Sequence, residues 1–276
     1  MRPISIPQSV KKYLGDQTSQ QALCDAAALG CKRLLKGTPE VSIVIPAYNE
    51  EFTIAATLAS LAENITSRSV EIVVVDNNSA DRTAEIAMKC GARCVPQPLQ
   101  GITHARNMGL SLAKGKYIMN ADADTIYPKD WIELMVKPLD SSEVSLTYGR
   151  FSFIPTAGTG RFVYFFYEMI ADFSRWLNRN FHEEGVNVYG FNSAFRREQG
   201  LSVDSFNHPS HTNEDGWLAM KLRNAGYGKL NYVHHPKARV WTTDRRIQID
   251  GGLLKGSWKR IKRIISGLTP RNVAHP

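Results

Sequence analysis

The chain has few cysteines and no long hydrophobic run, and both absences limit what it can be. Four cysteines in 276 residues are too few for a disulfide-built secreted domain, so we expect reduced thiols. Its longest apolar stretches, such as residues 162–167, are far shorter than the roughly 20 residues that span a bilayer. Residues 1–16 contain no apolar signal core, which indicates a cytoplasmic location.

Acidic residues are scarce at the C-terminal end. The chain carries 34 Lys+Arg and 26 Asp+Glu, a net charge of +8, and residues 245–276 hold +7 of it. Proteins that bind nucleic acid usually spread basic residues over their reading surface, so we expect no nucleic-acid partner. The 43% hydrophobic content can bury a substantial core and excludes a disordered chain.

Short apolar segments alternate with helical patterns in the first half of the chain. Continuous apolar runs predict strands over 41–45, 71–75 and 116–119. Helical spacing of apolar residues predicts helices over 50–62, 80–88 and 105–113. Fully apolar strands between helices indicate a parallel sheet that is covered on both faces. Ligands of such sheets bind beyond the carboxyl ends of the strands.

Beyond about residue 140 the regular alternation of strands and helices ends. This indicates one fused fold whose second part has a different role from the first. An aromatic-rich helix is predicted over 160–177. Its aromatic residues either face a membrane, receive a lipid-linked acceptor or pack in the core, and we favour the core, because aromatic stripes at helical spacing usually lie there. A strand-and-turn segment over 185–197 and a helix over 215–224 follow.

Polar clusters stand directly after the predicted strands, as Pro46-Ala-Tyr-Asn-Glu50, Asp76-Asn-Asn-Ser-Ala-Asp81 and Asp122-Ala-Asp124. If the chain turns after Ala121, Asp122 and Asp124 converge on one hard cation, Mg²⁺ or Mn²⁺, and a nucleotide diphosphate completes its shell. The alternative is that both carboxylates only cap the following turn. The position of the pair after an apolar strand, beside further polar clusters, favours the metal site.

Four other residues, in these clusters and at the start of the last predicted helix, allow two interpretations. Asp76 either accepts hydrogen bonds from a base or ribose or caps a helix, and Tyr48 either stacks on a base or packs at the sheet edge. Glu214 and Asp215 open the helix over 215–224. They either complement its dipole as a structural cap, or Asp215 is a base that this position keeps ionised.

Four segments, in this order, resemble family 2 glycosyltransferases of the GT-A fold: VSIVIPAYNEE, IVVVDNNSADRT, GITHARNMGLSLAKGKYIMNADADT and TNEDGWLAMKLRNAGYG. The resemblance implies an α/β fold in which a Rossmann-like nucleotide-binding half with a mixed central sheet is fused to a smaller acceptor-binding half. The catalytic domain would cover 40–246, with a nucleotide-sugar half of about 40–140 and an acceptor half of about 141–246. An N-terminal helical extension, 1–39, would precede it, and a basic amphipathic tail, 247–276, would follow.

The resemblance also implies an activity, the inverting transfer of a sugar from a UDP- or GDP-sugar to a hydroxyl acceptor. The acceptor would be a saccharide or lipid-linked, in cell-surface glycan or glycolipid assembly, and the cofactor would be Mn²⁺ or Mg²⁺. Asp215 would be the base, with Glu214 orienting the acceptor, and Asp124 with Asp122 would hold the cation. The residues implied along the nucleotide are Pro46, Ala47, Tyr48, Asn49, Glu50, Asp76, Asn78, Arg106, Asp122 and Ala123.

The chain departs from the family pattern near its C-terminal end. Many members carry a late histidine that completes the metal shell, and Thr242 stands at that position here. His234 and His235 either replace it or are strand-end residues. Arg245 and Arg246 either add positive charge at the diphosphate or begin a solvated basic tail. The signature of processive synthases, Gln-x-x-Arg-Trp, is missing, which favours a single-transfer enzyme.

The tail has a helical stripe of apolar residues between basic ones, at Leu254, Trp258, Ile261, Ile265 and Leu268. Such a helix either lies on an anionic membrane, making the protein peripheral, or docks its stripe on the body of the protein. We favour the membrane, because the basic density exceeds what solubility requires.

Two other classes of function compete with sugar transfer. A nucleotidyltransferase also binds a nucleotide and a metal at acidic strand ends, but it needs a Gly-rich basic loop that residues 46–50 do not supply. A catalytically inactive, membrane-associated module that binds nucleotide sugars is disfavoured because both acidic pairs are retained.

Overall fold

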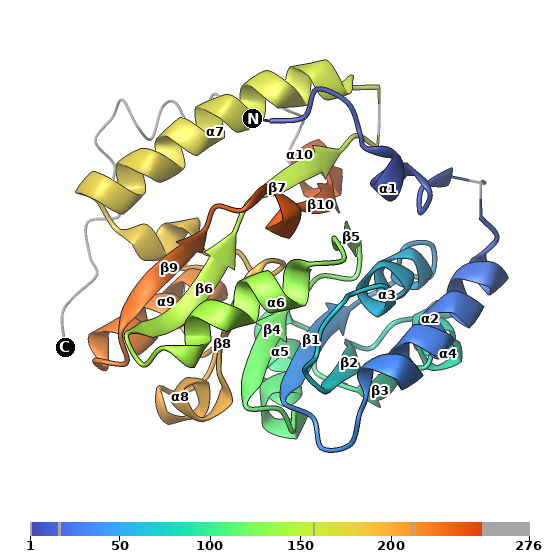
Figure 1. The fold of residues 1–276 in the computed structure, drawn as a ribbon, viewed down its shortest axis with the longest axis horizontal. Coiled ribbons are helices and arrows are strands. Elements are labelled where there is room, and N and C mark those ends of the chain that lie inside the picture. The colour runs from blue at the N-terminus through green and yellow to red at the C-terminus, as the bar shows by residue number, and fades with distance from the viewer. Residues whose placement is uncertain (1, 16–17, 157, 211, 250–276) are drawn as a thin grey trace.

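The computed structural model describes residues 2–15, 18–156, 158–210 and 212–249, in which the strands form two sheets (Figure 1). The larger sheet has the strand order β3-β2-β1-β4-β8-β6-β9, and the smaller has the order β5-β10-β7. The strands are β1 (Val41–Ala47), β2 (Val70–Asp76), β3 (Arg93–Pro96), β4 (Tyr117–Asn120), β5 (Thr125–Ile126), β6 (Val144–Gly149), β7 (Phe151–Ile154), β8 (Ser193–Arg196), β9 (Lys229–Val233) and β10 (Val240–Thr243).

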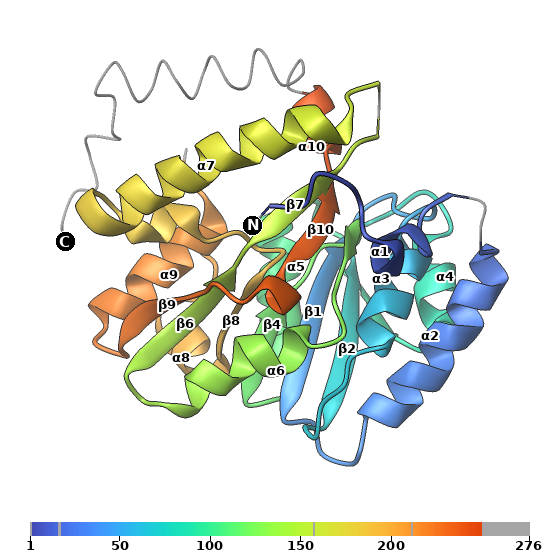
Figure 2. The same cartoon turned by 45° about the horizontal axis from the view of Figure 1, so that its top comes forward.

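Helices cover both faces of the larger sheet, and the longest helix lies outside the smaller one (Figure 2). The α-helices are α1 (Gln8–Lys11), α2 (Gln20–Leu34), α3 (Ile54–Ala62), α4 (Thr83–Lys89), α5 (Ile102–Leu112), α6 (Trp131–Val136), α7 (Arg161–Phe181), α8 (Arg197–Ser202), α9 (Glu214–Asn224) and α10 (Arg245–Ile249). Short 3₁₀ helices are η2 (Lys137–Asp140), η3 (Glu184–Asn187) and η4 (Pro236–Ala238).

The larger sheet is mixed, as the resemblance to the GT-A fold implied. Strands β3, β2, β1 and β4 run parallel, whereas β8 is antiparallel to both β4 and β6. The chain adds β2 and β3 on one side of β1 and then crosses to add β4 on the other. The carboxyl ends of β1 and β4 therefore flank a topological switch point, where α/β proteins bind ligands.

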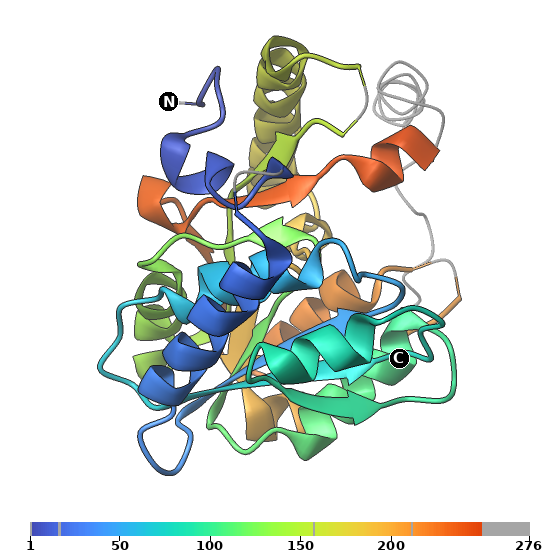
Figure 3. The ribbon, with the colours of Figure 1, turned by 90° about the vertical axis from the view of Figure 1, so that its right-hand side faces the viewer.

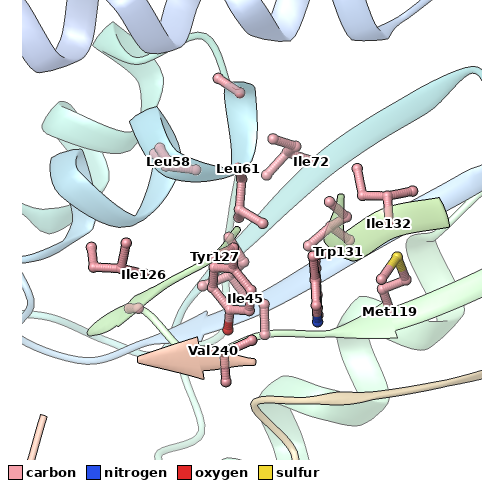
Figure 4. Packing of buried hydrophobic residues seen from close by; sticks show 14 of the residues in the cluster. Ile45, Leu58, Leu61, Ile72, Met119, Ile126, Tyr127, Trp131, Ile132 and Val240 are labelled. Carbon is pink, nitrogen blue, oxygen red and sulfur yellow. The ribbon is translucent and has the colours of Figure 1, made fainter. Parts of the chain in front are cut away.

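Alternate residues of β1 pack into separate cores on the two faces of this sheet. Ile43 and Ile45 belong to a cluster with α2, α3, α4 and α6, part of which is seen in Figure 4. Val44 belongs to the cluster that includes α5 and α9. Burial on both faces explains why the strand sequence is continuously apolar rather than alternating.

The observed elements confirm the predicted order but begin at different residues. The helix expected over 50–62 begins at Ile54, because Asn49 adopts a left-handed φ of 54° and the chain turns before the helix. The segment expected as strand and turn over 185–197 contains η3 and then β8. The same sheet contains strands from before and after residue 140, so the two proposed halves share one framework.

The prediction that the aromatic helix packs in the core is wrong. Helix α7 covers residues 161–181, and its large apolar side chains point outward; Phe162, Phe166 and Phe173 are 59%, 51% and 61% exposed. No helix within the described residues is long and apolar enough to cross a membrane. The amphipathic stripe over 251–268 lies outside the described residues.

Candidate active site

A cleft of about 390 Å³ opens at the carboxyl ends of β1 and β4, at the switch point of the sheet. The turns after both strands, the start of α5 and the start of α10 form its walls. The lining residues are Pro46, Ala47, Tyr48, Glu50, Asn77, Gln100, Gly101, Ile102, Asp122, Ala123, Asp124 and Arg245. All three polar clusters predicted from the sequence therefore contribute to one cleft, the second of them through Asn77 alone.

Glu50 and Arg245 join the first cluster to the end of the described chain. Glu50 is 8% exposed, and its carboxylate accepts hydrogen bonds from both terminal nitrogens of Arg245. The Arg245 Nη2 atom also lies 3.5 Å from Asp124 Oδ2. Arg245 thus carries positive charge into the cleft, while the side chain of Arg246 is not among those that the structure describes. Tyr48 is 51% exposed on the cleft wall, which favours a surface for stacking over packing at the sheet edge.

The loop after β2 supports the cleft more than it lines it. The Ala80 N–H donates to Asn49 Oδ1 at 2.9 Å, so Asn49 fixes this loop instead of facing the cleft. Asp76 is half-buried, and its Oδ1 atom has no hydrogen-bond partner within the described residues. Such an acceptor suits a donor group on a ligand. Asn78 is exposed, with a left-handed φ of 63°, and it does not line the cleft.

Asp122 and Asp124 stand on the turn between β4 and β5, and both line the cleft. The hydroxyl of Thr243 on β10 donates to Asp124 Oδ2. Burial raises the pKa of Asp124 to about 6, and the carboxylate of Asp122 adds to the rise. Arg106 donates to Asp122, so side chains from other elements hold both carboxylates, and this geometry favours a site for a cation or a cationic side chain over the turn-capping interpretation.

Arg106 lies beneath the cleft and does not line it. Its side chain is 1% exposed, and Nη2 donates to Asp122 Oδ1 and to the Gly190 carbonyl oxygen, both at 2.8 Å. Nη1 donates to the Ala121 carbonyl oxygen at 3.2 Å. Arg106 therefore positions Asp122 and joins the turn after β4 to the chain before β8.

Asp215 lies on the other side of this arginine, in the first turn of α9. It is 5% exposed, and its Oδ1 atom has no hydrogen-bond partner within the described residues. Burial raises the pKa of Asp215 to about 7, with Arg106 opposing the rise and Glu214 adding to it. A carboxylate of this pKa can exchange a proton near neutral pH.

The structure separates the two interpretations of the acidic pair. Asn213 is the N-cap of α9, and its Oδ1 accepts a hydrogen bond from the Gly216 N–H at 2.8 Å. The capping role belongs to this asparagine, which leaves Asp215 free of it. Glu214, in the same turn, is half-buried.

The fit of a cation can be judged from the oxygen donors that the cleft offers. Asp122 and Asp124 provide hard carboxylate ligands of the kind that Mg²⁺ and Mn²⁺ prefer. Within the described residues, no group of three His, Cys, Asp or Glu side chains could hold a metal by itself. The two carboxylates therefore fit a cation that shares its shell with substrate phosphate.

The two upstream histidines do not supply a further ligand at this cleft. The His234 Nε2 atom lies 3.3 Å from Arg150 Nη1, and the His235 side chain caps η4. Neither residue lines the cleft. Thr242 pairs with Thr125 in the smaller sheet, and it is the next residue, Thr243, that reaches Asp124.

Sequence reasoning missed three residues that shape the site. Thr243 holds Asp124, Asn77 fixes the wall by accepting from the Gly101 N–H at 2.8 Å, and Gly190 lies against Asp215. A Cβ added at Gly190 would lie 2.5 Å from Asp215 Oδ2 and 2.5 Å from Arg106 Nη2. No local pattern pointed to Gly190, because its close contacts, Arg106 and Asp215, come from distant segments.

Comparison with known proteins assigns this chain to a family. The family model for glycosyl transferase family 2 matches residues 42–199, more than half of the chain. An uncharacterized glycosyltransferase of Rickettsia felis is 30% identical over 151 residues, which are 53% of this chain and 25% of that protein. The Escherichia coli UDP-Glc:alpha-D-GlcNAc-diphosphoundecaprenol beta-1,3-glucosyltransferase WfgD is 29% identical over 45% of this chain and 50% of its own length. The chain thus spans a quarter to a half of these relatives.

Solved structures share the fold at lower identity. The mannosyltransferase PcManGT from Pyrobaculum calidifontis, in complex with GDP-Man and Mn²⁺, has a TM-score of 0.57 and 22% identity, over 88% of this chain and 76% of that one. S. aureus TarS 1-349 in complex with UDP has a TM-score of 0.58 and 18% identity, over 82% and 72%. The chain belongs to glycosyltransferase family 2 and has the GT-A fold.

Proposed function

We propose that the protein transfers a sugar, with inversion, from a UDP- or GDP-sugar to an acceptor hydroxyl. One observation carries this proposal: Asp215 is a buried carboxylate with a free oxygen and a pKa of about 7, one arginine away from the cleft. PcManGT was solved with GDP-Man and TarS with UDP-GlcNAc, which supports a nucleotide sugar as the donor.

The donor would lie with its nucleotide along the ends of β1 and β4. Tyr48 offers an exposed ring for a base, and the free oxygen of Asp76 offers an acceptor for a base or ribose N–H or O–H. The diphosphate would lie toward Asp124 and Arg245. Because Arg245 already pairs with Glu50, phosphate would compete for a guanidinium that is held in place.

Asp215 would act as the base. As the acceptor oxygen forms its bond to the anomeric carbon, Asp215 takes the hydroxyl proton, and the bond from that carbon to the phosphate oxygen breaks. The electron pair of the broken bond leaves with the nucleotide diphosphate. Since Asp215 is 5% exposed, an acceptor reaches it only after a local movement of the chain that covers it.

Asp122 and Asp124 would hold Mn²⁺ or Mg²⁺, which when bound neutralises charge on the leaving diphosphate. PcManGT was solved with Mn²⁺, which supports such a cofactor. Arg106 keeps Asp122 in place, and Thr243 keeps Asp124 in place. The acceptor would be a saccharide or a lipid-linked hydroxyl compound of cell-surface glycan or glycolipid assembly. A membrane role of 251–268 stays a prediction, since these residues lie outside the described part.

The test compares the wild type with Asp215→Asn, using release of nucleotide diphosphate from UDP-glucose, UDP-GlcNAc and GDP-mannose. Removing a general base should lower turnover by about 10²–10⁴-fold, while the affinity for the nucleotide diphosphate stays unchanged. Asp25→Asn, on the exposed face of α2, is the matched control and should behave as the wild type does.

Either of two results would overturn the proposal. Full turnover by Asp215→Asn would remove this residue as the base. Nucleotide binding by a wild type that turns over none of the donors would instead indicate an inactive binding module.

A further inference from the structure

Helix α7 is inverted, with its apolar side chains outward. Every exposed residue between positions 162 and 176 of this helix is hydrophobic. These residues, which we call the outer face of α7, are Phe162, Val163, Phe166, Met169, Ile170, Phe173 and Trp176. They contact one another: the rings of Phe162 and Phe166 lie 5.0 Å apart, and those of Phe173 and Trp176 lie 5.9 Å apart and stacked.

The inner side of the same helix carries its charges. Glu168 is 1% exposed and pairs with Arg2 at 2.9 Å and with Arg161 at 2.8 Å. Asp172 pairs with Arg2 at 2.6 Å and with Arg150 at 2.8 Å. Although burial opposes ionisation, the guanidinium groups of Arg2 and Arg175 hold the pKa of Asp172 well below its usual range. The ion pairs fix the rotation of α7, so the outer face is not free to turn inward.

A surface helix of a protein that meets only water has the opposite arrangement, with apolar residues toward the core. Contiguous apolar patches of several large side chains mark contacts with proteins or membranes. In Figures 2 and 3, α7 forms the outermost layer of the described fold, with the smaller sheet beneath it. Its outer face therefore needs a partner that no described residue provides.

The described chain ends beside this helix. Tyr164 of α7 donates to the Asp244 carboxylate, and the Gln248 side chain of α10 lies 3.4 Å from the Tyr164 hydroxyl. Residues 250–276, which follow α10, contain six basic residues and one acidic residue. The sequence that follows α10 therefore carries a net charge of +5.

We propose that the outer face of α7 docks on an anionic lipid membrane. Phe, Trp and aliphatic side chains insert at the boundary between headgroups and acyl chains, and nearby cations attract anionic headgroups. A second copy of this chain fits less well, because pairing through α7 would bring two of these basic segments together. If residues 250–276 of the chain itself covered the outer face of α7, their basic residues would have no anionic partner.

Docking through α7 would also bring the cleft close to the membrane. Asp244 is held by α7, and the next residue, Arg245, lines the cleft and pairs with Glu50. Toward the other end of the helix, the Asn187 side chain donates to the Arg175 carbonyl oxygen at 2.9 Å, and Gly190, which lies against Asp215, follows three residues later. The docking is independent of the transfer reaction, whereas its use in reaching a lipid-linked acceptor rests on the proposed function.

The test is flotation of the full chain with vesicles of phosphatidylcholine, with and without phosphatidylglycerol. The double variant Phe166→Gln/Phe173→Gln should lower the partition onto anionic vesicles about tenfold or more, because binding scales with the apolar area that is inserted. Glutamine retains helix propensity, and both positions are exposed, so the fold should be kept. The matched control is Leu29→Gln/Met88→Gln, on exposed positions of α2 and α4, and it should float as the wild type does.

The outcomes separate the possible occupants of the outer face. Equal flotation of the double variant and the wild type would overturn the proposal, and so would a wild type that does not float with anionic vesicles. A lipid-free dimer that the double variant dissociates, without vesicle binding, would assign the face to a second copy. Release of nucleotide diphosphate should be unchanged in the double variant, so failure of the docking and failure of the transfer reaction are distinguishable.

Discussion

Asp215 is the residue on which the proposed chemistry depends most. Its buried carboxylate is not capping α9, since Asn213 does that, and its Oδ1 atom is unpaired within the described residues. Leaving a carboxylate oxygen unpaired in a buried place has a cost in stability. Residues of this kind are common where a site needs a shifted pKa.

The pH dependence of turnover follows from this carboxylate. A base acts when deprotonated, and burial raises the pKa of Asp215 to about 7. We expect kcat/KM to rise about tenfold per pH unit below pH 7 and to level off above it. A profile that is flat between pH 5 and 8, measured with the preferred donor, would contradict the assignment.

The same shift predicts how stability changes with pH. The folded-state pKa lies above the unfolded value, so the protonated form favours folding at low pH, and this contribution is lost as pH rises through about 7. The melting temperature of the wild type should therefore fall more between pH 5 and pH 8 than the melting temperature of Asp215→Asn does. An equal change in both proteins would show that Asp215 does not titrate between these pH values.

At the scale of elements, the contact between α5 and β1 holds the cleft in shape. Gly109 of α5 faces Val44, and a Cβ at this glycine would overlap the Val44 Cγ1 atom and lie 3.3 Å from Val75 Cγ2. Val44 stands just before the turn that carries the first polar cluster. The missing side chain thus allows the helix to approach the strand closely.

Gly109→Ala should destabilise the fold by about 1–3 kcal/mol, because an added methyl group in a packed core forces the backbone apart. Chemical denaturation of both proteins measures this difference. Gly160→Ala is the matched control, since its Cβ would meet nothing within 4 Å, and its effect should stay within about 0.5 kcal/mol. Equal stability of Gly109→Ala and the wild type would mean that the helix can shift without cost.

Local sequence patterns predicted where the strands and helices lie, but they did not predict which side of α7 faces the solvent. The buried strands β1 and β2 and the helix α9 follow from continuous apolar runs and from Leu218 and Leu222, both of which are buried. The inversion of α7 depends on Arg2, which is 166 positions from Glu168. No local periodicity carries information about that ion pair.

At the scale of the whole molecule, the cleft is assembled from segments that are far apart in the sequence. Residues after β1 and β4 could be placed together from the rule for parallel sheets, because both strands end at the same edge. Arg245 was one of two arginines placed at the diphosphate by one of two interpretations, but the arrival of Thr243 there depends on β10 pairing with β5 and β7, which no sequence pattern indicated. The nucleotide side of the site was therefore predictable in outline, and the closing of the cleft by the C-terminal strand was not.

The central claim is that this cleft binds a nucleotide diphosphate together with a cation on Asp124. Calorimetric titration of UDP and of GDP into the wild type, with Mn²⁺ and with a chelator, tests it directly. We expect one nucleotide to bind with an affinity that falls about tenfold or more when Mn²⁺ is removed or Asp124 is changed to Asn. The control Asp130→Asn, outside the cleft lining, should bind as the wild type does. Equal wild-type affinity with and without Mn²⁺, or an Asp124→Asn variant that binds the nucleotide as tightly as the wild type does, would contradict the account.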